Sequence, residues 1–440
     1  MPARTAEELP RLLGLLDSTV VVIGTMIGVG VFLVPASIAR QVPSPPLILA
    51  LWLIGGLISL CGALAYAELG AMMPNSGGPY VYLREAYGPL VAFLCGWTYF
   101  LVVNSGAIAT VSVGFSIYLS YLLPTVPGVT RWAPILLILT LTYVNYRGVR
   151  AGARTQLIFT VLKLSGLALV ISCAFITPNP RPFDWSIPSS GISAMTIGAA
   201  LMGCFVAYDG WHNVAFIAGE VRNPQRILPR ALAIGVIAVM GVYLAANIAY
   251  LRVLPIDVIA ATERVAAHAA AQVLGPLGAT LVTLTIVLSS AGAGNGALMT
   301  SARVYYAQAR DGLFFRSMAE VHARYRTPAV AILIQGIWTA LLTITGSYET
   351  LFTYTLYASW LVHAMAVLAL LVLRKKRPHA ERPYRMWGYP LAPLLFVAFA
   401  LWFVINTFVT RPGSSLVGTL IVASGVPAYF FWRRKATMGA

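Results

Sequence analysis

Three glycines, Gly24, Gly28 and Gly30, interrupt an apolar run over residues 15–39. The run is long enough to cross a bilayer, which takes ~20 helical residues. Each interior glycine costs a helix roughly 1 kcal/mol relative to alanine, so Gly28 and Gly30 together favour a break of the helix at membrane depth. Lipid cannot pair the N–H and C=O groups that a break exposes, so water, protein or a ligand must do so.

A zwitterion would satisfy both ends of such a break. The second half-helix offers free N–H donors and the positive end of a dipole to an anionic group. The first half-helix offers free carbonyls to a cation. The alternative is that the glycines only let a neighbouring helix approach closely, as small residues do in membrane helix bundles.

A second apolar segment, residues 191–218, carries a polar interruption near its middle, at residues 206–213. Asp209 lies in this interruption and is the only carboxylate well inside a predicted span. A charge at that depth costs at least ~2.5 kcal/mol, which makes Asp209 a functional candidate. The alternative is that Asp209 caps the second half of the span, since aspartate is favoured at helix N-caps. The two roles are compatible.

Lys163 lies nine residues after Arg154 in another apolar segment. At 1.5 Å per residue this distance is ~14 Å, close to half of a ~30 Å hydrocarbon core. One interpretation is that Lys163 places a fixed cation behind the broken helices. The other is that its amine extends to the inner membrane interface, as long cationic side chains often do.

Glu68 lies at the end of one apolar segment and Glu220 follows another, and both lie on the inner side among many arginines. Ion pairs there could close an inner gate, although surface pairs of little consequence are an equal alternative.

No metal, cofactor or catalytic site is expected. The five histidines, His212, His268, His322, His363 and His379, are scattered without the spacing of metal ligands. The sequence has no Gly-x-Ser-x-Gly motif and no nucleophile with an evident base, which argues against an intramembrane hydrolase and against an enzyme in general.

The composition is that of a polytopic membrane protein. Of 440 residues, 59% are hydrophobic and 10% are charged, and the mean hydropathy is +0.79. Soluble domains have ~25% charged residues. The four cysteines, Cys61, Cys95, Cys173 and Cys204, all lie in apolar runs, so we expect buried thiols without disulfides. The predicted fold class is all-α.

Twelve membrane spans are predicted, at residues 15–41, 46–73, 88–121, 132–147, 154–177, 191–218, 229–253, 274–309, 328–345, 349–373, 388–409 and 415–432. The first and sixth spans both carry an interruption, so the first ten spans divide into two halves of five. Because each half has an odd number of spans, the two halves have opposite orientations in the membrane. Paired broken helices in two such halves are typical of the central site of a transporter.

The distribution of basic residues predicts the orientation. Of the 30 Lys and Arg residues, 23 fall in the segments on the side of the N-terminus, 6 fall on the other side, and Lys163 lies within a span. Basic residues accumulate on the cytoplasmic side, so we expect both termini in the cytoplasm. The net charge of +16 is therefore a sign of membrane topology, and no nucleic-acid partner is expected.

Several motifs resemble those of amino-acid permeases. Residues 24–32 resemble the family signature Gly-x-x-Ile-Gly-Ser-Gly-Ile-Phe. Residues 68–80 resemble the second motif, residues 207–224 the motif of the sixth span, and residues 301–312 the end of the eighth. In combination the motifs are similar to the L-type amino-acid transporter branch of the amino acid–polyamine–organocation superfamily, in its prokaryotic-like form.

The resemblance implies a LeuT-type fold, with inverted repeats at 15–177 and 191–373 and two additional helices at 388–432. It implies that the substrate carboxylate meets the amides near Gly28, Val29 and Gly30. The substrate amine is expected to meet the carbonyls of Met26, Val206 and Asp209. The residues expected to contact the substrate are Thr25, Met26, Ile27, Gly28, Val29, Gly30, Phe205, Val206, Ala207, Tyr208 and Asp209. Lys163 matches a lysine that stands where sodium-driven relatives hold a sodium ion, which implies sodium-independent transport.

The sequence departs from the family pattern at several positions. Val206 stands where many eukaryotic members have Phe, so an outer aromatic lid would be lost unless Phe205 or Tyr208 replaces it. Asp209 replaces Gly, and Val29 replaces the Ser of the signature. The loop at 124–131 lacks the cysteine that eukaryotic members use to bind a glycoprotein subunit, so no disulfide-linked heavy subunit is expected.

The sequence thus predicts a multi-pass amino-acid transporter of a plasma membrane, specifically a bacterial inner membrane. Its expected activity is sodium-independent exchange of small to medium neutral L-amino acids by alternating access. Its expected partners are the amino-acid substrate and membrane lipid, and no cofactor is expected. One alternative is a proton-coupled or cationic amino-acid or polyamine carrier with Asp209 as the proton or cation site. Another is a membrane enzyme or scaffold without transport, which the two interrupted spans disfavour.

Overall fold

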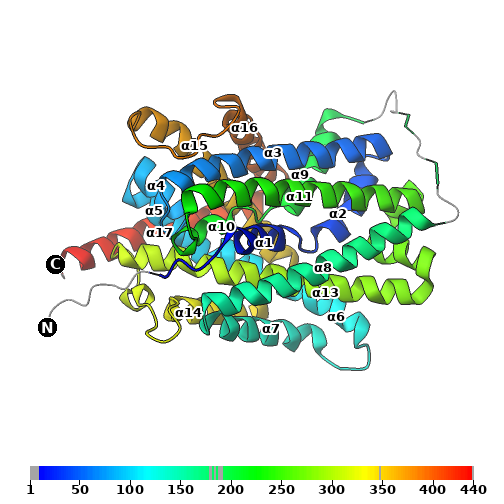
Figure 1. Cartoon of the computed structure of the whole chain (residues 1–440), viewed down its shortest axis with the longest axis horizontal. Helices are drawn as coiled ribbons and strands as arrows, with labels where there is room; N and C mark the ends of the chain where they lie inside the picture. The colour runs from blue at the N-terminus through cyan, green and yellow to red at the C-terminus, as the bar shows by residue number, and fades with distance from the viewer. Residues whose placement is uncertain (1–8, 178–180, 183–184, 187–191, 346–347, 439–440) are drawn as a thin grey trace.

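The fold is a bundle of helices that run mostly along one axis (Figure 1). It is seen in a computed structural model that describes residues 9–177, 181–182, 185–186, 192–345 and 348–438. Within these residues the only β-type pairing is an isolated bridge between Leu13 and Val221. The all-α prediction is therefore confirmed for the part of the chain that the structure describes. Residues 1–8 and residue 191, where the sixth span was predicted to begin, lie outside it.

Seven predicted spans correspond to single long helices. These are α3 (Pro45–Met72), α8 (Val149–Ile176), α11 (Pro224–Val253), α13 (Val265–Arg310), α15 (Tyr348–Lys376), α16 (Leu391–Thr410) and α17 (Pro412–Met438). α13 has a kink at Gly275, whose φ of 63° is left-handed and suits a residue without a side chain.

The other predicted spans are divided or shorter. They correspond to α1 (Leu15–Met26) with α2 (Gly30–Gln41), to α5 (Pro89–Thr98) with the π-helix η1 (Tyr99–Val103) and α6 (Asn104–Leu122), and to α7 (Val129–Tyr146), α9 (Ala194–Tyr208) and α14 (Ala329–Thr345). Short connecting elements are α4 (Pro79–Tyr87), α10 (Asn213–Phe216), η2 (Ala218–Glu220), α12 (Ile256–Ala261) and η3 (Arg316–Ala319).

The helices are those of a multi-pass membrane protein. Among the described residues, eight helical segments are long and apolar enough to cross a membrane. The pair α1 and α2, bent by 41°, meets the same criterion when its two helices are taken together, as a single broken span would. α7, α9 and α14 lie where the fourth, sixth and ninth spans were predicted but do not meet the same criterion. The count of twelve spans therefore stays a prediction.

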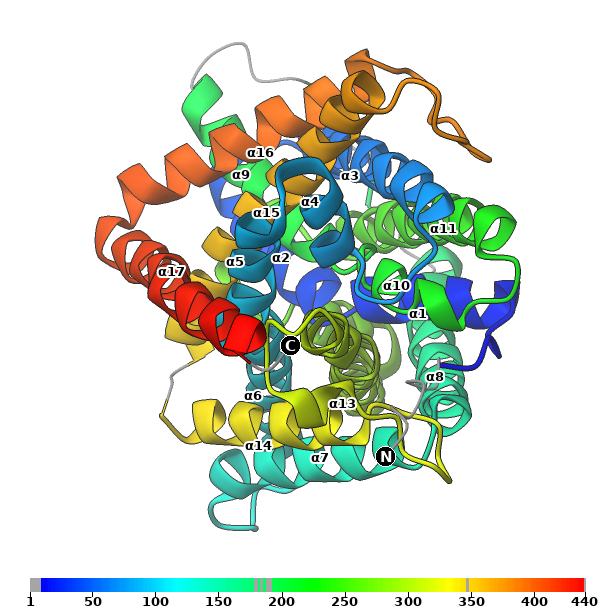
Figure 2. The ribbon, with the colours of Figure 1, turned by 90° about the vertical axis from the view of Figure 1, so that its left-hand side faces the viewer.

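The packing puts the two broken segments near the centre of the bundle. Viewed along the helices, α13 lies centrally, with α1 and α10 beside it, while α16 and α17 lie at the edge (Figure 2). α13 packs against α8, α6, α1 and α10, and α2 packs against α9. The described chain begins and ends at the same end of the bundle, on the left in Figure 1.

Candidate functional site

Two helix breaks face each other in the middle of the bundle. The first lies between Met26 and Gly30, where Ile27 leaves helical geometry with φ −78° and ψ 89°. The second follows Tyr208, where the chain turns at residues 209–212 before α10 begins. Thr25 joins the two breaks, since its hydroxyl donates a hydrogen bond of 2.8 Å to the carbonyl of Gly210.

A cavity of about 310 Å³ lies between the breaks. This volume is near the lower end of the usual range for small-molecule sites, roughly 300–1,000 Å³, and suits a small ligand. Of the eleven residues predicted to contact substrate, eight line this cavity: Thr25, Met26, Gly28, Val29, Gly30, Val206, Ala207 and Asp209. The start of α2 therefore borders the cavity. The Phe32 and Leu33 N–H groups donate to the carbonyl of Val29 at 3.1 and 3.2 Å, and the Gly28 N–H donates to the carbonyl of Met26 at 2.9 Å. Among the described residues this leaves the N–H groups of Val29 and Gly30 available to a ligand.

The other three predicted residues are directed elsewhere. The Phe205 ring stacks on Phe399 of α16 at 4.0 Å between centroids. The Tyr208 hydroxyl donates a hydrogen bond of 3.0 Å to the carbonyl of Trp52 in α3. Neither ring lines the cavity, so the expectation that one of them replaces an aromatic lid does not hold in this conformation. Ile27 is fully buried, and its carbonyl faces Lys163.

The three glycines of the first break have different roles. A Cβ on Gly24 would lie 1.9 Å from Nε2 of Gln156, so Gly24 lets α1 pack against α8. A Cβ on Gly30 would lie 2.8 Å from Cα of Ala207, so Gly30 lets α2 approach α9. The nearest atom to a Cβ on Gly28 would be 3.8 Å away, which is ordinary contact. Close packing thus accounts for Gly24 and Gly30, while Gly28 leaves space in the cavity.

Lys163 is fully buried in α8, and its amine binds the first break from behind. Its Nζ donates hydrogen bonds to the carbonyls of Gly24 at 2.8 Å, Ile27 at 2.6 Å and Ser289 at 3.3 Å. The amine is therefore not directed to the membrane interface. Because two of these three hydrogen bonds go to carbonyls of the first break, the amine fixes the carbonyl end of α1.

Hydroxyl groups bind further carbonyls of the first break. The Ser289 hydroxyl donates to Ile27 at 2.9 Å and to Gly28 at 3.1 Å. The Tyr243 hydroxyl lies 2.9 Å from the carbonyls of both Met26 and Ala207. The Met26 carbonyl, an expected partner of the substrate amine, therefore already has two protein partners, the Tyr243 hydroxyl and the Gly28 N–H at 2.9 Å. A carbonyl oxygen has two lone pairs, and the Tyr243 hydroxyl has one proton to share between Met26 and Ala207, so the Met26 carbonyl accepts from a substrate only when Tyr243 donates to Ala207.

Asp209 ends α9 instead of starting the next helix. It is the C-cap residue of α9, and the N-cap position of α10 is taken by His212. The expected N-cap role of Asp209 is therefore wrong. Its carboxylate instead accepts a hydrogen bond of 2.8 Å from the N–H of Gly210, within the turn itself.

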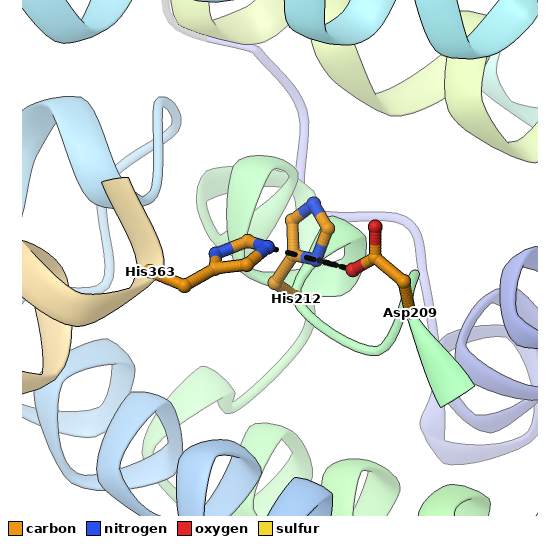
Figure 3. Close-up of side chains that lie close together, drawn as sticks. All are labelled: Asp209, His212 and His363. Carbon is orange, nitrogen blue, oxygen red and sulfur yellow. Dashed lines mark ion pairs between the residues drawn. The ribbon is translucent and has the colours of Figure 1, made fainter. Parts of the chain in front are cut away.

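Two histidines converge on this carboxylate (Figure 3). Nδ1 of His212 and Nε2 of His363 each lie 3.4 Å from Oδ1 of Asp209. His363 comes from α15, more than 150 residues along the chain from His212, and both imidazoles are buried. The expectation that the histidines are scattered is thus wrong for these two, because sequence spacing says nothing about contacts between distant helices.

A sequence profile of the amino acid permease family matches residues 13–431 of this chain. The chain belongs to the amino acid permease family. It is 30% identical to the serine/threonine exchanger SteT of Bacillus subtilis, over 97% of this chain and 98% of that one. It is 32% identical to Asc-type amino acid transporter 1 of Mus musculus and 34% identical to large neutral amino acids transporter small subunit 2 of Homo sapiens. Each match covers 97% of this chain and 82% of the relative.

These relatives identify the permease as an amino-acid transporter of the L-type branch of the amino acid–polyamine–organocation superfamily. The family and these relatives are transporters and not enzymes. The chain is thus a multi-pass membrane protein that transports amino acids.

Sequence reasoning missed much of the permease cavity. Polar side chains from three other elements line it, namely Asn104 and Thr110 of α6, Asn213 of α10, and Thr355 and Ser359 of α15. Small polar residues within apolar spans are a weak signal, because their hydroxyls often bond their own helix, as Ser301 does to the carbonyl of Ala297 at 2.6 Å.

The two ends of the permease cavity differ. A neighbouring cavity shares Val34, Ser37, Val206 and Leu356 with it and continues to Arg411 after α16. In the opposite direction, Glu220 and Arg303 form a buried ion pair at 2.6 Å, with both side chains at most 1% exposed. The cavity thus shares residues with a neighbouring cavity on the Arg411 side, whereas Glu220 and Arg303 line neither cavity and are paired with each other.

Glu68 forms a second ion pair, at 2.6 Å, with Arg374 of α15. The two glutamates singled out in the sequence are therefore both paired within the protein, and both carboxylates are buried. The alternative of an inconsequential surface pair does not apply to either glutamate.

Proposed function

We propose that this permease exchanges small to medium neutral L-amino acids without sodium, by alternating access. The observation that carries the proposal is the cavity between two helix breaks, bordered by Gly28 and Val29 of the first break and by Gly30 at the start of α2. The N–H groups of a helix start suit a carboxylate. The carbonyl groups near the breaks suit an ammonium group. Backbone groups of this kind bind the part that all amino acids share.

The proposed substrate class rests on the size and lining of the cavity and on the relatives. Apart from Asp209 and His212, the cavity is lined by apolar and small polar side chains, including Val29, Val206 and Ala293. Similar relatives are named a serine/threonine exchanger and a transporter of large neutral amino acids. Neutral amino acids of small or medium size fit both observations.

We propose sodium independence because Lys163 supplies a fixed cation to the carbonyls of the first break. Its amine contacts two carbonyls of that break, at 2.6 and 2.8 Å. A sodium ion would need oxygen ligands of this kind, and here the amine already uses them. Lys163 would then hold α1 in place through the whole transport cycle.

The proposed architecture is the LeuT-type arrangement of twelve spans, with inverted repeats at 15–177 and 191–373 and two additional helices at 388–432. The breaks after α1 and α9 lie in corresponding positions of these halves, which supports the proposal. In this arrangement the Glu220–Arg303 pair is an inner gate that opens when the Arg411 end closes. Both termini would lie in the cytoplasm of a cell with its plasma membrane as the site of transport, here a bacterial inner membrane.

We further propose that the permease works without a heavy subunit. All four cysteines are free and lie within helices, at Cys61, Cys95, Cys173 and Cys204. The loop between α6 and α7 contains no cysteine for a disulfide to another chain.

One alternative function has a specific observation in its favour. The Asp209 carboxylate lines the cavity and is 26% exposed, so it could hold a proton or bind a cationic substrate group. The permease would then carry cationic amino acids or polyamines, or couple transport to protons.

Counterflow in proteoliposomes tests the proposal and separates it from the alternative. Vesicles loaded with one unlabelled amino acid are diluted into labelled substrate, for each of the twenty amino acids, with and without sodium. We expect accumulation driven by neutral amino acids in both media. Accumulation driven only by arginine, lysine or a polyamine would refute neutral exchange and favour the alternative.

A further inference from the structure

Asp209, His212 and His363 form a compact set of metal-ligating side chains beside the substrate cavity. Their ligand atoms, Oδ1, Nδ1 and Nε2, all lie within 4.8 Å of one another. The three side chains point toward a common space, two from the turn after α9 and one from α15 (Figure 3). Such convergence from separate elements is what a metal site requires and a sequence pattern does not reveal.

Two of the three distances between ligand atoms match the edges of a metal-centred tetrahedron, and the third, between the two histidine nitrogens, is within 4.8 Å. Zinc binds imidazole nitrogen and carboxylate oxygen at ~2.0–2.2 Å in tetrahedral geometry. At those bond lengths two ligand atoms are ~3.3–3.6 Å apart, from the tetrahedral angle. Both histidine nitrogens lie 3.4 Å from the carboxylate oxygen of Asp209. These separations are long for hydrogen bonds but suit atoms that share one ion.

The surroundings leave one of the two histidine nitrogens without a partner and orient the other imidazole. Nδ1 of His212 is buried and, within the described chain, has no hydrogen-bond partner. Nδ1 of His363 lies 3.3 Å from the hydroxyl of Tyr66, which fixes the imidazole so that Nε2 faces Asp209. A metal-ligating histidine usually has such a partner on its other nitrogen. Nε2 of His363 has the hydroxyl of Ser359, a residue that lines the cavity, as its partner at 3.0 Å, and this hydroxyl must turn away when Nε2 binds an ion.

We propose that Asp209, His212 and His363 bind one divalent transition-metal ion of the Zn²⁺ class. Two imidazoles and one carboxylate form a ligand set that such ions prefer, while Ca²⁺ and Mg²⁺ prefer oxygen ligands. Three protein ligands leave a fourth position, which faces the cavity. The ion links the unwound end of α9 to α15 and so restrains their relative movement, which slows transport.

Cobalt absorption tests binding without relying on transport. Purified full-length protein is titrated with Co²⁺, whose four-coordinate complexes with nitrogen ligands absorb visible light strongly. We expect one equivalent to bind and to be displaced by Zn²⁺. His363→Gln and His212→Asn should each weaken binding at least about tenfold, since even the partners of ligands contribute 10- to 100-fold to metal affinity. The matched control is His268→Gln, which removes an exposed histidine elsewhere.

Thermal melting shows whether each variant is folded. If one of the two ligand variants does not fold, the other alone can be compared with the unmodified protein. No saturable cobalt signal, or a signal that both ligand variants retain, would overturn the metal site. Equal loss of the signal in His268→Gln would overturn its assignment to this cluster. Zn²⁺ should also slow exchange by the unmodified protein and not by His363→Gln. Binding without slowing would overturn the proposed restraint.

Discussion

Replacing Lys163 should slow transport while leaving the protein folded and in the membrane. The Gly24 carbonyl has Lys163 as its hydrogen-bond donor at 2.8 Å, whereas the Ile27 carbonyl keeps the Ser289 hydroxyl at 2.9 Å. Lys163→Ala therefore leaves chiefly one buried carbonyl unpaired, at ~1–3 kcal/mol. If that energy holds α1 in its transport-competent position, turnover should fall roughly 5- to 150-fold, at tenfold per ~1.36 kcal/mol.

Lys163→Met distinguishes loss of the amine from loss of side-chain volume, because methionine fills much of the same space without an amine. Both variants should lose turnover far more than apparent affinity, since the amine contacts the break and not the cavity. The assay is initial exchange rate in proteoliposomes against substrate concentration. Arg154→Met, on the exposed face of the same helix, is the matched control and should behave as the unmodified protein. Normal turnover in both Lys163 variants would show that the lysine has no role in coupling.

Four further results are expected. Replacing sodium by choline should leave initial exchange rates unchanged, and a severalfold fall would contradict the role of the lysine as an ion surrogate. Gly28→Ala should keep the melting temperature but weaken substrate binding in a thermal-shift titration. Gly30→Ala should instead lower the melting temperature, because its Cβ would lie 2.8 Å from the backbone of α9. Equal behaviour of the two variants would count against this distinction. Asp209→Asn keeps an oxygen for the Gly210 N–H and should retain neutral exchange from pH 5 to 8, while loss of flux would favour the proton- or cation-linked alternative. Glu220→Gln should cost ~3–5 kcal/mol of stability by leaving a buried arginine unpaired, and a melting temperature like that of the unmodified protein would argue against a gate at this position.

The helical fold could be predicted largely from the sequence, because apolar runs and glycines act locally. Gly28 and Gly30 lie at the break itself, since the penalty of a glycine in a helix does not depend on distant contacts. The depth of Lys163 along its span likewise suggested an amine within reach of the first break. The distinction between Gly28 and Gly30 could not be predicted, because it depends on which helix packs opposite each Cα.

The missed part of the site depends on contacts between distant segments. His363 reaches Asp209 only because α15 packs beside the turn after α9, and no spacing in the sequence encodes that packing. The N-cap role of Asp209 was wrong for a related reason. The chain turns for several residues after α9, and the next helix begins only at Asn213. Phe205 and Tyr208 lie on the faces of α9 that pack against α16 and α3, which helical periodicity alone does not determine.

The most direct test of the proposed binding site is a cryo-electron microscopy structure of the permease with a neutral amino acid that it exchanges. We expect density for one molecule in the cavity between the two breaks, with its carboxylate at hydrogen-bond distance from the N–H groups of Val29 and Gly30. Its ammonium group should face carbonyls at the end of α1 and of α9. Substrate density outside this cavity, or a carboxylate directed away from the start of α2, would contradict the proposal that the broken helices bind the amino acid.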